Sequence, residues 1–391
     1  MMTESRRLIA LVLVCLLTVP AFAAEPPVVG SIRVAMETFV KEKKAAGIVT
    51  LVMHNGKLIH LDAVGQADIE AGKPMKADTL FWIASMTKPM TGTALAILED
   101  EGKLSADDPV SKYIPAFKDV KLEGKAPSRP ITLRDLMTHS SGIGEARGAQ
   151  SVAGATLEDI ANAIAAQPMK FEPGTKWSYG SGLTVIGRVI EVVSGKPYDV
   201  FLKERIFDPL GMKDTTFNLS DAQLKRIARS YKPNAGKDGL ERVDNRYVID
   251  DPSQKQTPNP SGGLFSTAHD LARFYQMVAQ WGELDSKRIV SEPAAKRMTS
   301  MLLDESITTG FTPGNSWGYG FCVVREPQGV TGMLSPGSCG HGGAHGTQSW
   351  CDPRRQIVFI MLVQRTGFGN GDASEIRHAL QELAVKHVEA K

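Results

Sequence analysis

Strand-like segments stand at both ends of this chain and helical patterns fill its middle, and this division constrains the fold most. Near the N-terminus, Ile48–His54 and Lys57–Val64 flank Asn55-Gly56. That dipeptide favours a type I′ hairpin turn, because both central positions of such a turn need positive φ. Near the C-terminus, strand patterns recur at Tyr319–Arg325, Gly340–Cys351 and Gln356–Gln364. We therefore expect one antiparallel sheet built from both chain ends.

Helical periodicity covers most of the remaining chain. It predicts helices over 31–46, 85–104, 132–139, 156–166, 182–194, 198–207, 267–281 and about 373–388. The economical topology packs the terminal helices on the sheet and makes the centre an inserted second lobe. We expect an α/β (α+β) fold in one domain, residues 24–391. Its α/β lobe would span about 30–90 and 315–391, and its helical lobe about 91–314. A cleft between lobes is a common place for a site.

Residues 1–23 have the order of a secretory signal. Arg6 and Arg7 precede the apolar run Leu8–Pro20, and small residues at positions 21 and 23 predict cleavage after Ala23. The run is too short to span a bilayer comfortably, and no second long apolar segment follows. We therefore expect export to the periplasm or medium and no stable membrane span after cleavage; Sec and twin-arginine routes both stay open.

The net charge limits the classes of partner, and the cysteine content limits the possible disulfides. Lys+Arg 45 against Asp+Glu 43 leaves a net charge of +2, so no nucleic-acid partner is expected. A small molecule is the expected partner, and the oligomeric state stays open. Cys15 leaves with the signal, whereas Cys322, Cys339 and Cys351 remain. A hairpin turn at His345 would place Cys339 opposite Cys351, so one bridge or three reduced thiols are both possible.

The segment Ser85-Met86-Thr87-Lys88 opens a helical pattern. In a helix, Lys88 lies one turn after Ser85 on the same face. A desolvated lysine has a lowered pKa and can accept the serine proton. The second segment, Trp177-Ser178-Tyr179-Gly180-Ser181, could bring a tyrosine into the cleft. We expect a nearby lysine ammonium to lower the pKa of Tyr179, although a packed aromatic with one hydrogen bond is the plainer interpretation.

The third segment, Gly340–Thr347, is a glycine-rich strand and turn. Glycines within a strand mark the close approach of a backbone or ligand, and bare N–H groups could hold an oxyanion. His341 and His345 would lie about 13 Å apart on a strand, too far to share one metal ion. Ser316 fits G-x-S-x-G, but the order is turn then strand, which excludes it as a nucleophile elbow. No nucleotide-binding motif occurs, so no cofactor is expected.

With these three segments in this order, the chain resembles the serine β-lactamase and penicillin-binding protein superfamily. It is most similar to class C β-lactamases and family VIII carboxylesterases, over residues 30–390. Further matching phrases are 131–133 (ITL), 138–142 (THSSG), 208–212 (DPLGM) and 263–270 (GLFSTAHD).

The resemblance implies an acyl-enzyme mechanism. Ser85 would attack, Lys88 and Tyr179 would share the proton transfers, and the N–H groups of Ser85 and Ala344 would hold the oxyanion. The strand with His341, Gly342 and Gly343 would bind substrate, as would Ser181. His139 is interpreted as a structural histidine at a helix end.

Two departures from the family pattern favour ester hydrolysis. Ser181 stands where the family has asparagine, and His341 stands where β-lactamases have a lysine that meets the substrate carboxylate. The sequence therefore predicts a hydrolase of small esters. The alternatives are a D,D-carboxypeptidase, a D-aminopeptidase or a β-lactamase, with the same residues on an amide or peptide substrate, and a non-catalytic sensor that is acylated once.

Overall fold

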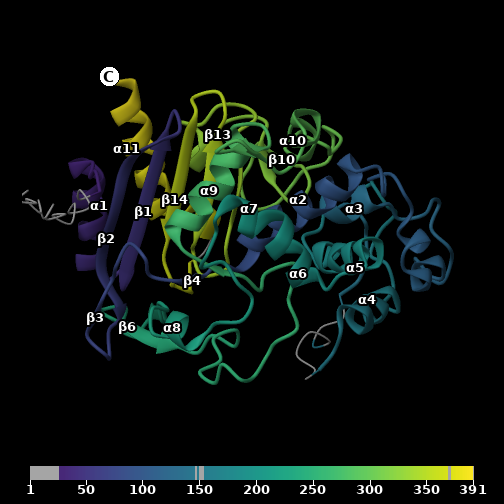
Figure 1. Ribbon diagram of the computed structural model, residues 1–391, viewed down its shortest axis with the longest axis horizontal. Coiled ribbons are helices and arrows are strands. Elements are labelled where there is room, and N and C mark those ends of the chain that lie inside the picture. The colour runs from purple at the N-terminus through teal and green to yellow at the C-terminus, as the bar shows by residue number, and fades with distance from the viewer. Residues whose placement is uncertain (1–25, 146–147, 149–153, 369–370, 391) are drawn as a thin grey trace, which may run out of the picture.

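The computed structural model describes residues 26–145, 148, 154–368 and 371–390, so the expected signal segment 1–23 lies outside the described residues. Its centre is one antiparallel sheet with the strand order β10-β11-β12-β13-β14-β1-β2-β3 (Figure 1). The strands are β1 (Gly47–His54), β2 (Lys57–Asp68), β3 (Lys73–Pro74), β10 (Asn315–Trp317), β11 (Cys322–Val324), β12 (Cys339–Gly342), β13 (Gln348–Asp352) and β14 (Ile357–Leu362).

The two chain ends meet where β1 pairs with β14. The register runs from Val49 opposite Leu362 to His54 opposite Ile357. The turn between β1 and β2 has positive φ at Asn55 (49°) and Gly56 (73°), as a type I′ turn requires. The predicted hairpin and the sheet built from both ends are therefore confirmed.

Helices cover both faces of the sheet. The terminal helices α1 (Gly30–Lys41) and α11 (Glu375–Glu389) pack together on the outer face, and α9 (Ala268–Ala279) lies across β13, β14 and β1 on the inner face (Figure 1). β1 is buried on both sides because its side chains alternate between two cores. Val49 and Leu51 belong to the core on the α9 side, whereas Val52 packs with α1 and α11.

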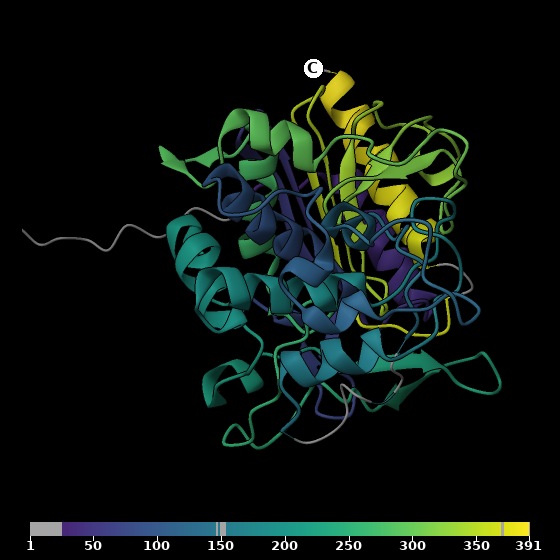
Figure 2. The same cartoon turned by 90° about the vertical axis from the view of Figure 1, so that its right-hand side faces the viewer.

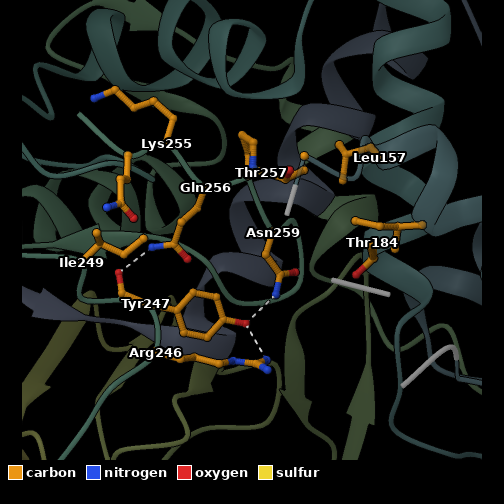
Figure 3. Close-up of a pocket in the computed structure, with 13 residues that line it drawn as sticks. Leu157, Thr184, Arg246, Tyr247, Ile249, Lys255, Gln256, Thr257 and Asn259 are labelled. Carbon is orange, nitrogen blue, oxygen red and sulfur yellow. Dashed lines mark hydrogen bonds between the residues drawn. The ribbon is translucent and has the colours of Figure 1, made fainter. Parts of the chain in front are cut away.

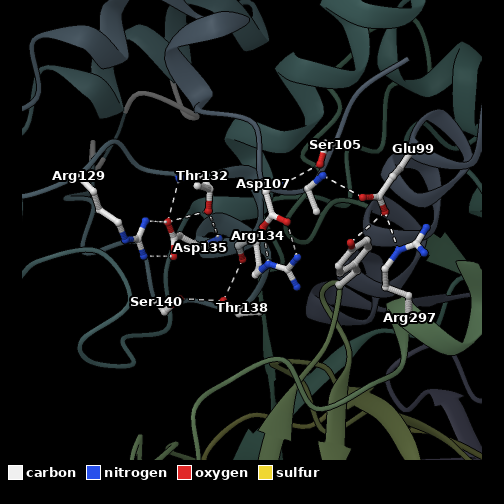
Figure 4. Close-up of polar contacts among 12 residues, drawn as sticks. Glu99, Ser105, Asp107, Arg129, Thr132, Arg134, Asp135, Thr138, Ser140 and Arg297 are labelled. Carbon is white, nitrogen blue, oxygen red and sulfur yellow. Dashed lines mark hydrogen bonds and ion pairs between the residues drawn. The ribbon is translucent and has the colours of Figure 1, made fainter. Parts of the chain in front are cut away.

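The helical lobe stands beside the sheet and faces the viewer in Figure 2. A short helix, α8 (Asp221–Leu224), lies apart from this lobe, beside β6 (Leu240–Val243) (Figure 1). The helices of the lobe are α2 (Thr87–Asp100), α3 (Leu133–Met137), α4 (Leu157–Ala165), α5 (Gly182–Ser194), α6 (Tyr198–Leu202), α7 (Asp208–Leu210) and α10 (Glu292–Met298). Among them α2 is the most buried, and it packs against α5, α10 and α6. Glu99 on α2 ties the lobe to the strands, because its Oε2 accepts from Arg297 (3.0 Å) and from the Tyr319 hydroxyl (2.9 Å) (Figure 4).

The structure differs from the sequence expectations in several places. α1 ends at Lys41 and α2 at Asp100, four or more residues before the expected ends. The expected strand Tyr319–Arg325 is a tight turn followed by β11, because Gly320 has φ +69° and its backbone lies against the Lys88 carbonyl. α9 falls in the range expected for the helical lobe, yet it packs on the sheet.

Three two-stranded ribbons were not expected from the sequence. They are β4 (Phe81–Trp82) with β7 (Phe265–Ser266), β5 (Ser230–Pro233) with β6 (Leu240–Val243), and β8 (Glu283–Leu284) with β9 (Lys287–Arg288). Within the described ranges, every helix is too short or too polar to cross a bilayer.

Candidate active site

Ser85 stands in a 3₁₀ turn, Ala84–Met86, that leads directly into α2. Lys88 is the second residue of α2, and its Nζ lies 3.2 Å from Ser85 Oγ. The same Nζ donates a 2.6 Å hydrogen bond to the Ser261 carbonyl. Pro89 falls in the first turn of α2, where a missing N–H costs nothing. The structure thus brings serine and lysine together at the spacing that the sequence predicts.

Lys88 is 2% exposed. Burial lowers its pKa from 10.5 to about 7, because the protein interior disfavours the charged ammonium. The Tyr179 ring lies beneath Nζ, with 4.6 Å between Nζ and the ring centroid. An amine in this state is available as a proton acceptor at neutral pH.

Tyr179 behaves differently from the expectation of a lowered pKa. Burial raises the pKa of Tyr179 well above its ordinary value, and its hydrogen bond with the Ser85 hydroxyl opposes this only in part. The expected decrease was wrong because the desolvation of a phenolate outweighs the stabilisation available from its neighbours. The phenol is therefore neutral and can donate a proton to an oxygen at Ser85.

Ser85 opens into a cleft of about 450 Å³ between the lobes. Ala344, in the turn after β12, lines the same cleft and is exposed to it. The two residues expected to supply oxyanion N–H groups therefore share one cavity. The other residues that line this cleft are Trp82, Ala84, Asp244, Asn245, Arg246, Tyr247, Asn259, Ser261, Gly262 and His345.

The residues expected to bind substrate have less direct access to the Ser85 cleft than Ser85 and Ala344 do. Ser181 is the N-cap residue of α5 and lies outside the lining of the Ser85 cleft. His341 is 4% exposed, and burial with the nearby Lys88 lowers its pKa to about 3. A Cβ on Gly342 would stand 2.0 Å from Asp372 Oδ1, and one on Gly343 would stand 2.6 Å from the Ile83 carbonyl oxygen. These two glycines serve close packing of protein atoms.

A second cavity of about 340 Å³ adjoins the cleft (Figure 3). Arg246, Tyr247 and Asn259 line both cavities, so they form the wall between them. The Tyr247 ring stacks on Trp82 at 4.8 Å, and its hydroxyl accepts from Arg246 and Asn259 at 3.0 Å each. The lining of this cavity is mixed. Its apolar part comes from Leu157, Ile160, Ile249 and Pro258, and its polar part includes Thr184, Gln254, Lys255, Gln256 and Thr257.

The cysteine prediction concerns a strand pair beside the site. Cys339 on β12 lies opposite Cys351 on β13, in the register that the predicted turn requires. Their Sγ atoms are 3.4 Å apart, and both are free thiols, as is Cys322. Over the described ranges, no group of three or more His, Cys, Asp or Glu side chains could hold a metal ion. Ser316 lies within β10, as expected for a serine outside a nucleophile elbow.

The sequence indicates that the loop around 235–260 helps to set the shape of the pocket, and residues within 244–262 do line it, but their individual contacts were not predicted. The Gly262 carbonyl accepts from Trp82 Nε1 at 2.8 Å, and the Ser261 carbonyl holds Lys88. The segment 259–263 (NPSGG) carries a recognisable turn signal, but nothing local indicates that it packs on α2.

The comparisons with known proteins agree with this geometry. The family profile described as Beta-lactamase matches residues 32–384. The chain belongs to this family. Esterase EstB of Burkholderia gladioli is 31% identical over 359 residues, which cover 84% of this chain and 88% of EstB. A D-alanyl-D-alanine carboxypeptidase candidate of Escherichia coli K12 is 29% identical over 80% of this chain and 76% of its own length.

This beta-lactamase family member also resembles a solved structure in its fold. EstCE1, "a hydrolase with promiscuous acyltransferase activity", superimposes with a TM-score of 0.77 at 23% identity. The match covers 91% of this chain and 97% of EstCE1. The family and the esterase relative identify the protein as a serine hydrolase with a β-lactamase/transpeptidase-like fold.

The titration of Lys88 yields a prediction for this hydrolase. If the neutral amine accepts the Ser85 proton, kcat/KM falls as pH decreases through about 7, the pKa of Lys88. The measurement is the pH profile of p-nitrophenyl butyrate hydrolysis between pH 5 and 9. Tyr179→Phe is the control: it lowers the rate but keeps the midpoint, because the phenol does not titrate in this range. A wild-type midpoint below pH 5 contradicts the assignment to Lys88.

Proposed function

We propose that this protein is an exported serine hydrolase that cleaves small, uncharged carboxylic esters through an acyl-serine intermediate. The observation that carries the choice of ester is the state of His341. A buried imidazole with a pKa of about 3 is neutral at physiological pH, so it offers no cation to a substrate carboxylate. The esterase relative supports the same class of substrate.

The proposed reaction begins with proton transfer from Ser85 Oγ to the Lys88 amine, whose atoms lie 3.2 Å apart. Oγ then forms a bond to the ester carbonyl carbon, and the carbonyl oxygen becomes an oxyanion. Backbone N–H groups of Ser85 and Ala344 stabilise that charge. As the carbon–alkoxide bond breaks, the proton on Lys88 passes to the departing oxygen, directly or through the Tyr179 hydroxyl. Water then releases the acid by the same steps and restores Ser85.

A second candidate is a carboxypeptidase acting on peptides that end in a D-amino acid. The observation in its favour is Arg246, an exposed cation that lines the Ser85 cleft and could meet a terminal carboxylate. The carboxypeptidase relative supports this alternative. Release of D-alanine from a D-Ala-D-Ala peptide, at a higher kcat/KM than any ester, would favour it.

The nucleophile is tested with p-nitrophenyl butyrate and the β-lactam nitrocefin. We expect sustained ester turnover, and Ser85→Ala should reduce it by at least about 10³-fold because nucleophile and base act as a unit. Lys88→Ala should reduce ester turnover by a similar factor. Activity that survives in Ser85→Ala contradicts the mechanism. Dominant nitrocefin turnover contradicts the ester assignment, and one equivalent of product followed by arrest indicates a sensor.

The wall residue Tyr247 gives a prediction about substrate size. Tyr247→Ala joins the two cavities of about 450 and 340 Å³, so longer acyl chains gain apolar surface to bury. We expect the kcat/KM ratio of p-nitrophenyl octanoate to butyrate to rise about tenfold, the scale of one or two methylene contacts. Tyr247→Phe keeps the ring on Trp82 and should leave the ratio unchanged. Equal ratios in all three proteins contradict this role.

Export is tested by the mass of the protein recovered from the periplasm of a bacterial host. The expected mature chain begins at Ala24, because a small residue at Ala23 is read by signal peptidase. Ala23→Arg should block this cleavage, whereas the matched change Phe22→Tyr should not. A chain that keeps residues 1–23 in both the wild type and Phe22→Tyr contradicts the proposal.

A further inference from the structure

His139 ends α3 in a conformation that normally selects glycine. Its φ is +60°, its N–H lies 3.5 Å from the Leu136 carbonyl, and the next N–H, of Ser140, donates to Asp135 at 2.9 Å. These two bonds form a Schellman motif with His139 at the left-handed position. Glycine would adopt this φ without the clash that a Cβ brings. A buried histidine here, 2% exposed, points to a use for its side chain.

That side chain and its backbone hold Tyr179 from three directions. The His139 carbonyl accepts from the N–H of Ser178 at 2.9 Å, and His139 Nδ1 accepts from the N–H of Gly180 at 3.4 Å. Between these two bonds the imidazole packs on the phenol ring of Tyr179, with 4.5 Å between centroids. One residue therefore contacts Tyr179 and both of its chain neighbours.

The His139 imidazole is neutral, and its hydrogen bond determines which ring nitrogen carries the proton. Because a backbone N–H donates to Nδ1, the remaining ring proton lies on Nε2. Burial, together with the nearby Lys88 and His341, lowers the pKa of His139 well below its ordinary value. The other faces of the ring meet Trp177 and Trp317 at centroid distances of 6.1 and 4.9 Å. His139 therefore packs within an aromatic cluster and adds no charge beside Tyr179.

Several hydrogen bonds and an ion pair hold the segment that carries His139. At the start of α3, Thr132 and Asp135 form a capping box, and Arg129 binds both carboxylate oxygens of Asp135 at 2.6 and 2.9 Å (Figure 4). Beyond the helix, the Ser140 carbonyl accepts from the N–H of Gly174 at 2.8 Å, so three hydrogen bonds attach the loop that carries Tyr179 to this segment. The position of α3 thus fixes the position of the Tyr179 loop.

We propose that His139 is a positioning residue for the reaction at Ser85, holding Tyr179 so that its hydroxyl stays on the serine oxygen. This inference rests on the proposed function, because it assigns Tyr179 a part in the proton transfers. It goes beyond the interpretation of His139 as a structural residue at a helix end, since the ring acts through one named partner.

The decisive experiment is a double-mutant cycle of His139→Gly with Tyr179→Phe. Glycine suits the left-handed backbone, so the first change removes the ring and the Nδ1 acceptor without adding strain. We expect it to lower kcat by about 10²-fold, as for a lost general acid–base group, with a smaller change in KM. In the Tyr179→Phe background the further loss should stay below about twofold, because residues that act as a unit are not additive.

His139→Asn provides the conservative comparison. Asparagine tolerates positive φ and keeps an acceptor near the position of Nδ1, so it should recover part of the lost rate. If circular dichroism shows that His139→Gly does not fold, His139→Asn replaces it in the double-mutant cycle. The matched control is His60→Asn. Like His139, His60 is a buried histidine, and both of its ring nitrogens are hydrogen-bonded, but it lies on β2 at the far side of the sheet. That variant should lose stability and keep the wild-type kcat.

Two results would overturn the inference. One is kcat within about threefold of wild type in both His139 variants, within the range of small structural effects. The other is an equal loss in the wild-type and Tyr179→Phe backgrounds. Fluorophosphonate labelling of Ser85 separates this failure from that of the proposed function. An unlabelled wild type, or hydrolysis that persists in Ser85→Ala, removes the proposed function; normal labelling with an additive cycle removes only the role of His139.

Discussion

Burial of the Lys88 amine is the interaction on which the rest of the site depends. Moving an ammonium out of water costs far more free energy than moving a neutral amine. Burial therefore lowers the pKa of Lys88 to about 7. The Ser261 carbonyl contacts Nζ at 2.6 Å and the Tyr179 ring centroid lies 4.6 Å from it. Gly320 in turn lets the chain before β11 approach the backbone of α2, where a Cβ would stand 2.6 Å from the Lys88 carbonyl oxygen. The meeting of sheet and helices thus creates the base.

The same kind of close approach positions the opposite wall of the cleft. Gly343 follows β12 and packs its backbone toward the Ile83 carbonyl, two residues before the nucleophile. Side chains at this point would push the turn with Ala344 away from Ser85. The glycine-rich strand therefore places the expected oxyanion N–H groups by its packing. A glycine required by a neighbouring backbone and one required by a substrate leave the same signal in a sequence. The packing at Gly342 and Gly343 explains why glycine stands at these positions, and their contact with substrate stays a prediction.

Local geometry was predictable from the sequence. Properties that depend on burial by distant segments were not. The Ser85 to Lys88 spacing and the position of Cys339 opposite Cys351 depend on helix pitch and strand register, which a few residues determine. The fold class followed from strands at both ends. The pKa of Tyr179 shifted opposite to the prediction, because the direction of the shift depends on residues that bury the ring from distant parts of the chain, from His139 to His341. The individual contacts of residues 244–262 and of the His139 ring were not predicted for the same reason: their partners lie far away in the sequence.

The charge balance of the site fits the proposed uncharged ester substrate. Tyr179, His139 and His341 are all neutral at physiological pH because burial disfavours each of their ions. When the Lys88 amine takes the serine proton, one positive charge appears as the tetrahedral intermediate gains one negative charge. In a medium of low dielectric constant this new pair attracts strongly, and the site stays neutral overall. A substrate carboxylate beside His341 would add a charge that the neutral imidazole does not balance, so the burial that creates the base also supports the proposed uncharged ester.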